Sequence, residues 1–180
     1  MSDIEEIQDE TNTVGWNILI RHATLDDLPT LEWDGEFVHF RRLYAETFRR
    51  AELGEAILWV ADLAEERVIG QVFVQLKSQR AELADGRTRA YVYGFRVRPA
   101  YRNAGIGTLM LQTLEEDLRR RGFRSVVLNV GKENMDARRL YERHGYQIIG
   151  TDPGRWSFID DKGQRRDVVE PAWRLEKLLE

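Results

Sequence analysis

A glycine-rich segment at residues 97–110, with the sequence VRPAYRNAGIGTLM, has the residue types of a phosphate-binding loop. It carries the spacing Arg102-x-x-Gly105-x-Gly107 between an alternating run and an apolar helical pattern. Small residues at a helix start let backbone N–H groups approach a pyrophosphate, and each contact with the helix dipole adds about 0.3–1 kcal/mol. The same pattern fits an ordinary glycine-rich helix start, and the segment alone does not separate the two interpretations.

Two other phosphate-binding motifs fit this segment poorly. A Walker A loop needs a lysine before its Ser or Thr to reach the terminal phosphates, whereas Gly107 precedes Thr108 here. A dinucleotide-binding fingerprint needs a third glycine, and Met110 stands at that place. Residues 1–90 also contain no Rossmann-type start. Dinucleotide binding and nucleotide hydrolysis are therefore disfavoured, although phosphate release from ATP or GTP would revive the hydrolase interpretation.

Asn134 and Tyr141 form a second pair of chemically capable residues. They are seven positions apart, which is two helical turns, so a helix places them on one face. Asn134 is also a good residue to cap a helix N-terminus. Tyr141 fits either a packed core aromatic or a proton donor, because a tyrosine pKa of about 10 keeps the hydroxyl protonated at neutral pH.

These residues must be positioned by a strand, a helix and a second strand. Residues 91–97 alternate between the two faces of a predicted strand. The expected common face carries Tyr91, Tyr93, Phe95 and Val97. The amphipathic pattern at 106–118 predicts a helix that ends at Gly122, and the apolar run at 125–130 predicts a strand buried on both faces. Such a unit normally forms a right-handed parallel crossover.

Periodicity and turn residues predict the remaining elements. They are a strand at 17–22, helices at 24–31 and 37–53, strands at 56–61 and 68–74, a helix at 135–143, a strand at 146–149, and a hairpin with arms at 155–159 and 167–175. This order predicts an α+β (mixed α/β) fold with antiparallel strands first and a parallel pair near the middle. We expect residues 1–15 to be a flexible tail and residues 16–180 to be a single domain.

The composition excludes several kinds of site. The 180 residues include no cysteine, which rules out a disulfide framework, a cysteine-based zinc site and a thiolate nucleophile. His22, His39 and His144 have no metal-ligand spacing, so we expect no metal. A net charge of −4 argues against a general nucleic-acid partner. The sequence has neither a signal peptide nor an apolar run long enough for a membrane, so we expect a soluble, cytoplasmic protein.

Three segments together resemble the GCN5-related N-acetyltransferase (GNAT) superfamily. VRPxYRxxGxG at 97–107 resembles its acetyl-CoA motif, NxxAxxLYExxGY at 134–146 resembles its second motif, and IRxATxxDLP at 20–29 is similar to its usual opening strand and helix. The resemblance covers about residues 17–150. It implies a central mixed, mostly antiparallel sheet with a splayed parallel strand pair, flanked by helices, and acetyl-CoA as co-substrate.

The resemblance also implies how acetyl-CoA would be held. The pantetheine arm would lie between the two parallel strands and pair with backbone groups of Phe95, Arg96 and Val97. The pyrophosphate would contact the N–H groups at the glycine-rich loop, which are those of Arg102, Asn103, Ala104, Gly105, Ile106, Gly107 and Thr108. The Asn134 side chain would contact the pantetheine or neighbouring cofactor groups. Tyr141 would be the catalytic acid that protonates the departing CoA thiolate.

The sequence departs from the family pattern at the positions where many members carry the general base. Many members carry a glutamate near the start of the first-motif strand or on the second parallel strand, and this chain has Tyr91 and Asn129 there. The sequence leaves three candidates for the general base in place of these glutamates: a water relay, Glu133 or Glu170.

The acceptor site, by the same resemblance, would be walled by the first two helices and the last hairpin. Its candidate residues are Trp33, Phe37, Phe40, Tyr93, Trp156 and Phe158, with Asp34, Glu36 and Glu170 as charges that could attract a cationic amine. The expected reaction is direct acetyl transfer to a primary amine of a small molecule or protein, in a chain that is a candidate homodimer. The alternative is a non-catalytic acyl-CoA-binding or regulatory module on the same fold.

Overall fold

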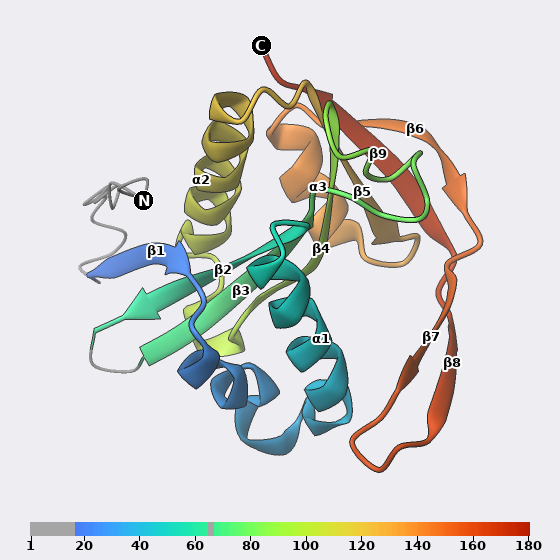
Figure 1. Cartoon of the computed structure of the whole chain (residues 1–180). Coiled ribbons are helices and arrows are strands. Elements are labelled where there is room, and N and C mark those ends of the chain that lie inside the picture. Colours follow the sequence, from blue (N-terminus) through green and yellow to red (C-terminus); the bar gives the residue numbers. More distant parts are fainter. Residues whose placement is uncertain (1–16, 65–66) are drawn as a thin grey trace.

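The computed structural model describes residues 17–64 and 67–180, so the expected tail at 1–15 lies outside the described residues. A seven-stranded sheet runs through the molecule in the order β1-β2-β3-β4-β5-β9-β6 (Figure 1). Its strands are β1 (Ile18–His22), β2 (Ala56–Leu63), β3 (Arg67–Gln75), β4 (Arg89–Val97), β5 (Ser125–Gly131), β6 (Gln147–Asp152) and β9 (Ala172–Leu178). A separate hairpin joins β7 (Arg155–Ile159) to β8 (Arg165–Val169).

Strand direction in this sheet confirms the expected mixed class. β4 and β5 are parallel, and the other neighbouring strands among the described residues are antiparallel. The parallel pair is joined by α2 (Ile106–Arg120), which is the predicted strand-helix-strand unit. β5 reads as a nearly continuous apolar run because both of its faces are covered.

Helices cover both faces of the sheet (Figure 1). On one face, α2 and α3 (Met135–Arg143) bury a core that includes Met110, Leu114 and Tyr141. On the other face, two 3₁₀ segments (Leu25–Gly35 and Val38–Phe40) and α1 (Arg41–Glu52) pack Leu31 and Tyr44 against β2 and β3. Among the described residues, no helix has the length and apolar character that crossing a bilayer requires.

The N-terminal helices differ from the prediction. The first is a 3₁₀ helix, Leu25–Gly35, in which Trp33 and Asp34 adopt positive φ angles of 47° and 58°. A capping box between Thr24 and Asp27 begins it as the sequence suggests, but Pro29 within the segment removes a backbone donor. The second helix begins at Arg41, because the preceding residues form a separate 3₁₀ turn.

The C-terminal hairpin also differs from the prediction. The expected arm at 167–175 is two strands, β8 and β9, which are separated at Glu170 and Pro171. Proline has no N–H for a strand ladder, which explains the break. β8 then stays in the hairpin, and β9 enters the main sheet between β5 and β6.

Candidate active site

The parallel strands β4 and β5 separate before β4 ends. Their register pairs residues 89–92 with residues 125–128 and stops at Val92 and Leu128. β4 continues to Val97, while β5 continues alongside β9 to Gly131. The β5-facing edge of residues 93–97 is therefore left without a strand partner in the described part of the chain. This is the splayed pair that the family resemblance implied.

A β-bulge at Gly94 changes the side-chain directions along β4. Gln71 lies opposite Arg96 and Phe73 lies opposite Tyr93, so one residue of β3 faces the two residues that intervene on β4. Gly94 adopts a φ of 61°, which glycine accepts readily. The Gln71 side-chain amide donates to the Gly94 carbonyl at 3.3 Å and holds the bulge.

The bulge overturns the predicted common face of this strand. Tyr91 and Tyr93 do share a face, with ring centroids 5.8 Å apart, and Tyr93 packs with the α1 core. Phe95 and Val97 instead pack against the α2 and α3 core. A strict two-residue period does not survive an inserted residue. The glycine inside the strand pattern was the signal that the periodicity argument missed.

The glycine-rich loop presents a run of backbone donors at the start of α2. The Arg102 side chain donates through Nε to the Val97 carbonyl at 2.9 Å, which fixes the loop against the end of β4. Asn103 and Gly105 adopt positive φ angles of 60° and 82°. Within the described residues, the N–H groups of residues 103–108 have no protein acceptor. Such a run of free donors at a helix N-terminus suits an anion.

Gly107 lies where three elements meet beside this loop. A Cβ at this position would lie 3.4 Å from the Phe95 ring and 3.7 Å from a methyl group of Leu140, which are ordinary van der Waals distances. The first turn of α2 therefore lies close to both β4 and α3. The structure thus assembles the sequence-predicted residues of β4, the loop and α3 in one region.

Asn134 and Tyr141 occupy the expected positions on α3. The Asn134 side chain accepts a hydrogen bond from the Ala137 N–H at 3.2 Å, which confirms its role as N-cap. Tyr141 is 7% exposed, and its ring makes edge contacts with Phe95 and Tyr146 at centroid distances of 6.3 and 5.7 Å. Burial raises the pKa of the Tyr141 hydroxyl, and nearby Tyr91 adds to the effect. Within the described residues, this hydroxyl has no hydrogen-bond partner.

His144 links the two helices of the site. It is the C-cap residue of α3, and its Nε2 lies 3.1 Å from the hydroxyl oxygen of Thr108 in the first turn of α2. Burial lowers the pKa of the imidazole, which favours the neutral ring. No local pattern predicts this contact, because 36 residues separate the two side chains.

A cavity of about 480 Å³ opens on the α1 side of β4 and β5. Of the residues expected at the acceptor site, Phe40, Tyr93, Trp156 and Glu170 line it. Phe37 and Phe158 contact Phe40 in the adjoining aromatic cluster. Trp33, Asp34 and Glu36 line a different cavity beside Arg98. The two departures from the family pattern, Tyr91 and Asn129, both lie in the wall of the first cavity, whereas Glu133 is not among its lining residues.

A buried carboxylate at the end of β6 organises the floor of this cavity. Asp152 is 7% exposed, and one of its oxygens accepts hydrogen bonds from Arg174, from Arg80 at 3.3 Å and from Asn129 at 3.4 Å. The other oxygen accepts from the Gly154 N–H at 2.7 Å. Burial opposes ionisation, but these hydrogen bonds and the two guanidinium charges bring the pKa of Asp152 below its ordinary value. Sequence reasoning missed this network, since its members come from distant segments.

Replacement of Asp152 by asparagine should destabilise the protein by about 2 kcal/mol at neutral pH, because Arg80 and Arg174 lose their shared carboxylate. The lowered pKa means that the carboxylate stabilises the fold above its unfolded pKa of about 3.9 and loses that contribution as pH falls. The difference between the two proteins should therefore shrink below about pH 4. Urea unfolding at several pH values measures it.

Asp167→Asn is the matched control for this prediction. Asp167 and its partner Arg165 have side chains that are 75% and 69% exposed, so their ion pair should contribute little. Equal effects of the two substitutions, or an Asp152→Asn effect that grows in acid, would contradict the assigned role of the network.

Comparison of the sequence with models of protein families identifies the family of this chain. The model of the acetyltransferase (GNAT) family matches residues 20–146, which include β4, the loop, α2 and α3. The chain belongs to the GNAT acetyltransferase family. Relatives that the chain resembles are described as N-acetyltransferases.

The curated relatives are similar over part of their length. The uncharacterized N-acetyltransferase YycN of Bacillus subtilis is 31% identical over 90 residues, which are 50% of this chain and 54% of that protein. N-alpha-acetyltransferase 50 of Danio rerio is 26% identical over 129 residues, covering 67% of this chain and 77% of that protein. The chain thus spans about half the length of the Bacillus relative.

Solved structures share the fold over nearly the whole acetyltransferase chain. Ard1 from Thermoplasma volcanium superposes with a TM-score of 0.69 at 18% identity, covering 91% of this chain and 98% of that one. An aminoglycoside 6'-N-acetyltransferase complexed with coenzyme A gives a TM-score of 0.62 at 17% identity, with coverage of 90% and 97%. At these identities the likeness establishes the fold.

Proposed function

We propose that this acyltransferase uses acetyl-CoA and transfers the acetyl group directly to a primary amine. The observation that carries the proposal is the convergence of three groups that lack protein partners within residues 17–64 and 67–180. They are the β5-facing edge of β4 beyond Val92, the N–H groups at the start of α2, and the hydroxyl of Tyr141. The coenzyme A in the aminoglycoside acetyltransferase complex supports a CoA-based donor on this fold.

The donor would bind chiefly through backbone groups. The pantetheine arm would lie along the free edge of β4 at Phe95, Arg96 and Val97, where β5 has turned away. The pyrophosphate would bind to the N–H groups of residues 103–108. The N–H group of Arg102, which we also expected there, donates instead to the Pro99 carbonyl at 3.3 Å. Because the Asn134 side chain is engaged as a helix cap, its contact with the donor would use the amide hydrogens that the cap leaves free.

The chemical step would use one side chain and one backbone group. A backbone N–H near Val97 would polarise the thioester carbonyl and stabilise the oxyanion that forms when the amine attacks. Tyr141 would then protonate the CoA thiolate as the carbon–sulfur bond breaks. The chain has no cysteine for an acyl-enzyme, so transfer would occur in a ternary complex.

The amine must lose a proton before it attacks, and the residues that line the cavity limit which side chain can act as the general base. Asp152 holds two guanidinium groups and has a lowered pKa, which makes it a weak base. Tyr91 is also unsuited to act as a base, because burial raises its pKa and keeps its hydroxyl protonated. Glu170 lines the cavity and Glu133 does not. We therefore assign proton removal to Glu170, directly or through water.

The pH dependence of turnover should reflect the Tyr141 environment. Because burial raises the pKa of Tyr141, the hydroxyl stays protonated throughout the range from about pH 6 to pH 9. The rate should therefore rise with pH as the amine is deprotonated, with no decline up to about pH 9. A bell-shaped kcat profile that falls within this range would contradict Tyr141 as a protonated acid.

A thiol-release screen tests the proposal against its alternative. Acetyl-CoA is incubated with the protein and a panel of primary amines, and both free CoA and acetylated amine are measured. Equal amounts of the two products are expected with at least one amine. Tight CoA binding without acetylation of any amine would favour the non-catalytic acyl-CoA-binding module.

A further inference from the structure

Arg96 has a side chain that the donor site does not use. The bulge at Gly94 turns it to the α1 side of the sheet, where it lines the cavity described above. Its guanidinium carbon lies 4.1 Å from the ring centroid of Phe37 and 5.3 Å from that of Phe40. Nη1 donates to the Tyr44 hydroxyl at 3.0 Å. Aromatic faces and one hydroxyl thus hold this cation in a fixed orientation.

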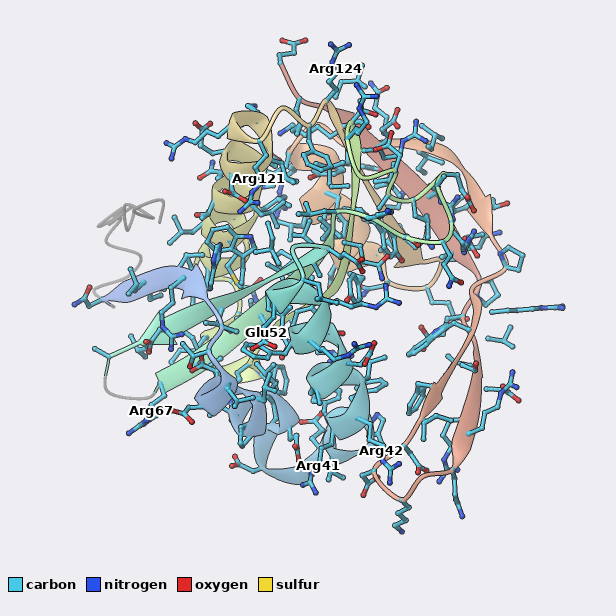
Figure 2. All side chains as sticks on the ribbon, viewed as in Figure 1. Arg41, Arg42, Glu52, Arg67, Arg121 and Arg124 are labelled. Atoms are coloured by element: carbon cyan, nitrogen blue, oxygen red, sulfur yellow. The ribbon has the colours of Figure 1, made fainter. Side chains whose placement is uncertain are left out.

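The Arg96 charge is uncompensated within the described residues, where it makes no ion pair. Some other arginines are neutralised by a neighbouring carboxylate. Arg41 at the start of α1 pairs with Glu32 at 2.8 Å, and Arg121 after α2 pairs with Asp117 at 2.8 Å. Figure 2 labels both of these arginines. Arginine carries five N–H donors in a planar fork that matches a carboxylate, and Tyr44 uses one of them.

The other charges of the cavity do not supply the missing anion. Asp152 is already shared by Arg80 and Arg174. Among the remaining charged lining residues, Arg155 adds a second positive charge and Glu170 one negative charge. In the described part of the chain, the charged lining groups without an ion-pair partner are therefore the guanidinium groups of Arg96 and Arg155 and the carboxylate of Glu170. A cavity of this balance disfavours a polycationic acceptor and suits a molecule that carries an anion as well as an amine.

We propose that the acetyl acceptor is a small amine that also carries a carboxylate, and that Arg96 binds this carboxylate. The inference rests on the proposed acetyl transfer to an amine. The cavity volume of about 480 Å³ is in the range of small-molecule sites. Its aromatic lining, which includes Phe40, Tyr93 and Trp156, fits an acceptor with an apolar body. An apolar amino acid combines the amine, the carboxylate and the apolar body.

The test compares acceptors that differ only in the anion. The two matched pairs are L-phenylalanine with L-phenylalaninamide, and 4-(aminomethyl)benzoate with 4-(aminomethyl)benzamide. Wild-type protein should acetylate at least one of the carboxylates with a higher kcat/KM than its amide. For phenylalanine this preference opposes intrinsic reactivity, since the amide has the more acidic ammonium group and is more fully deprotonated at about pH 8.

Variants at Arg96 locate the effect. Arg96→Met should raise the KM for the preferred carboxylate about 10- to 100-fold and leave the KM for its amide nearly unchanged. The KM of Arg96→Lys for the carboxylate should lie between those of wild type and Arg96→Met, because lysine keeps the charge and lacks the planar fork. Arg120→Met is the matched control, since Arg120 is exposed and pairs with Glu116 on α2. Thermal melting confirms that each variant is folded.

A binding measurement separates this inference from the proposed function. Calorimetry with CoA-loaded protein measures the affinity for each carboxylate in wild type and in Arg96→Met. Turnover that favours the amides, or is insensitive to Arg96→Met, overturns the carboxylate site while acetyl transfer stands. Binding that depends on Arg96 without acetylation of any probe supports the site and refutes transfer. If none of the carboxylates is bound and none is acetylated, the inference is overturned.

Discussion

The Tyr141→Phe variant should lose about 100-fold in kcat while its affinity for acetyl-CoA stays near the wild-type value. The ring fills the same space between Phe95 and Tyr146, so the fold should be preserved. The hydroxyl has no protein partner within the described residues, and its removal therefore leaves no buried group unpaired. The missing function is the proton for the CoA thiolate. Steady-state kinetics and calorimetry with CoA measure the two effects.

Tyr146→Phe is the matched control for this change. Tyr146 lies beside Tyr141 and is buried, and its hydroxyl donates to Glu115 at 3.5 Å, whereas the Tyr141 hydroxyl has no such partner within the described residues. This substitution also removes one phenolic oxygen but should leave kcat close to wild type. Unchanged turnover in Tyr141→Phe, or an equal loss in both variants, would refute the acid role.

Gly94→Ala should destabilise the protein by about 3 kcal/mol and weaken acetyl-CoA binding. A Cβ at Gly94 would lie 2.7 Å from the Phe73 ring, and the backbone φ of 61° is unfavourable for alanine. Relief of the contact would shift the bulge, and with it the backbone of Phe95 and Val97 that we propose holds the pantetheine. Chemical denaturation gives the stability, and calorimetry gives the affinity for CoA.

A double variant separates the two causes of this loss. Phe73→Leu removes the Cε2 atom that a Gly94 Cβ would meet at 3.1 Å and replaces the rigid ring with a side chain that can rotate away, but it leaves the strained φ. The Phe73→Leu/Gly94→Ala protein should therefore be less destabilised than the sum of the two single variants predicts. Strict additivity would show that the contact with Phe73 has no part in the effect.

The sequence predicted the elements whose signals are local. The N-cap at Asn134, the helix end at Gly122 and the apolar strand at 125–130 depend on neighbouring residues, and the structure has them in place. The order of these elements was enough to predict a mixed sheet with one parallel pair. The resemblance of three short motifs then supplied the family, which the comparison confirmed over residues 20–146.

The features that the sequence did not predict depend on tertiary contacts. The bulge at Gly94 reverses the faces of Phe95 and Val97, and its position is fixed by the register with β3. The Asp152 network joins side chains 22 to 72 residues apart, and no local pattern links them. β9 enters the sheet because Pro171 ends the hairpin strand before it. These contacts shape the cavity on the α1 side of β4 and β5, and for that reason no local pattern predicted its form.

Acetyl-CoA, as we propose, lies along the β5-facing edge of β4 with its pyrophosphate at the start of α2. Amide hydrogen exchange of the full protein, with and without acetyl-CoA, tests this placement most directly. Exchange at residues 93–97 and 103–108 should be slower when the donor is bound, because the N–H groups there that lack a protein acceptor gain one. Unchanged exchange in both segments at saturating acetyl-CoA, or protection confined to other segments, would contradict it.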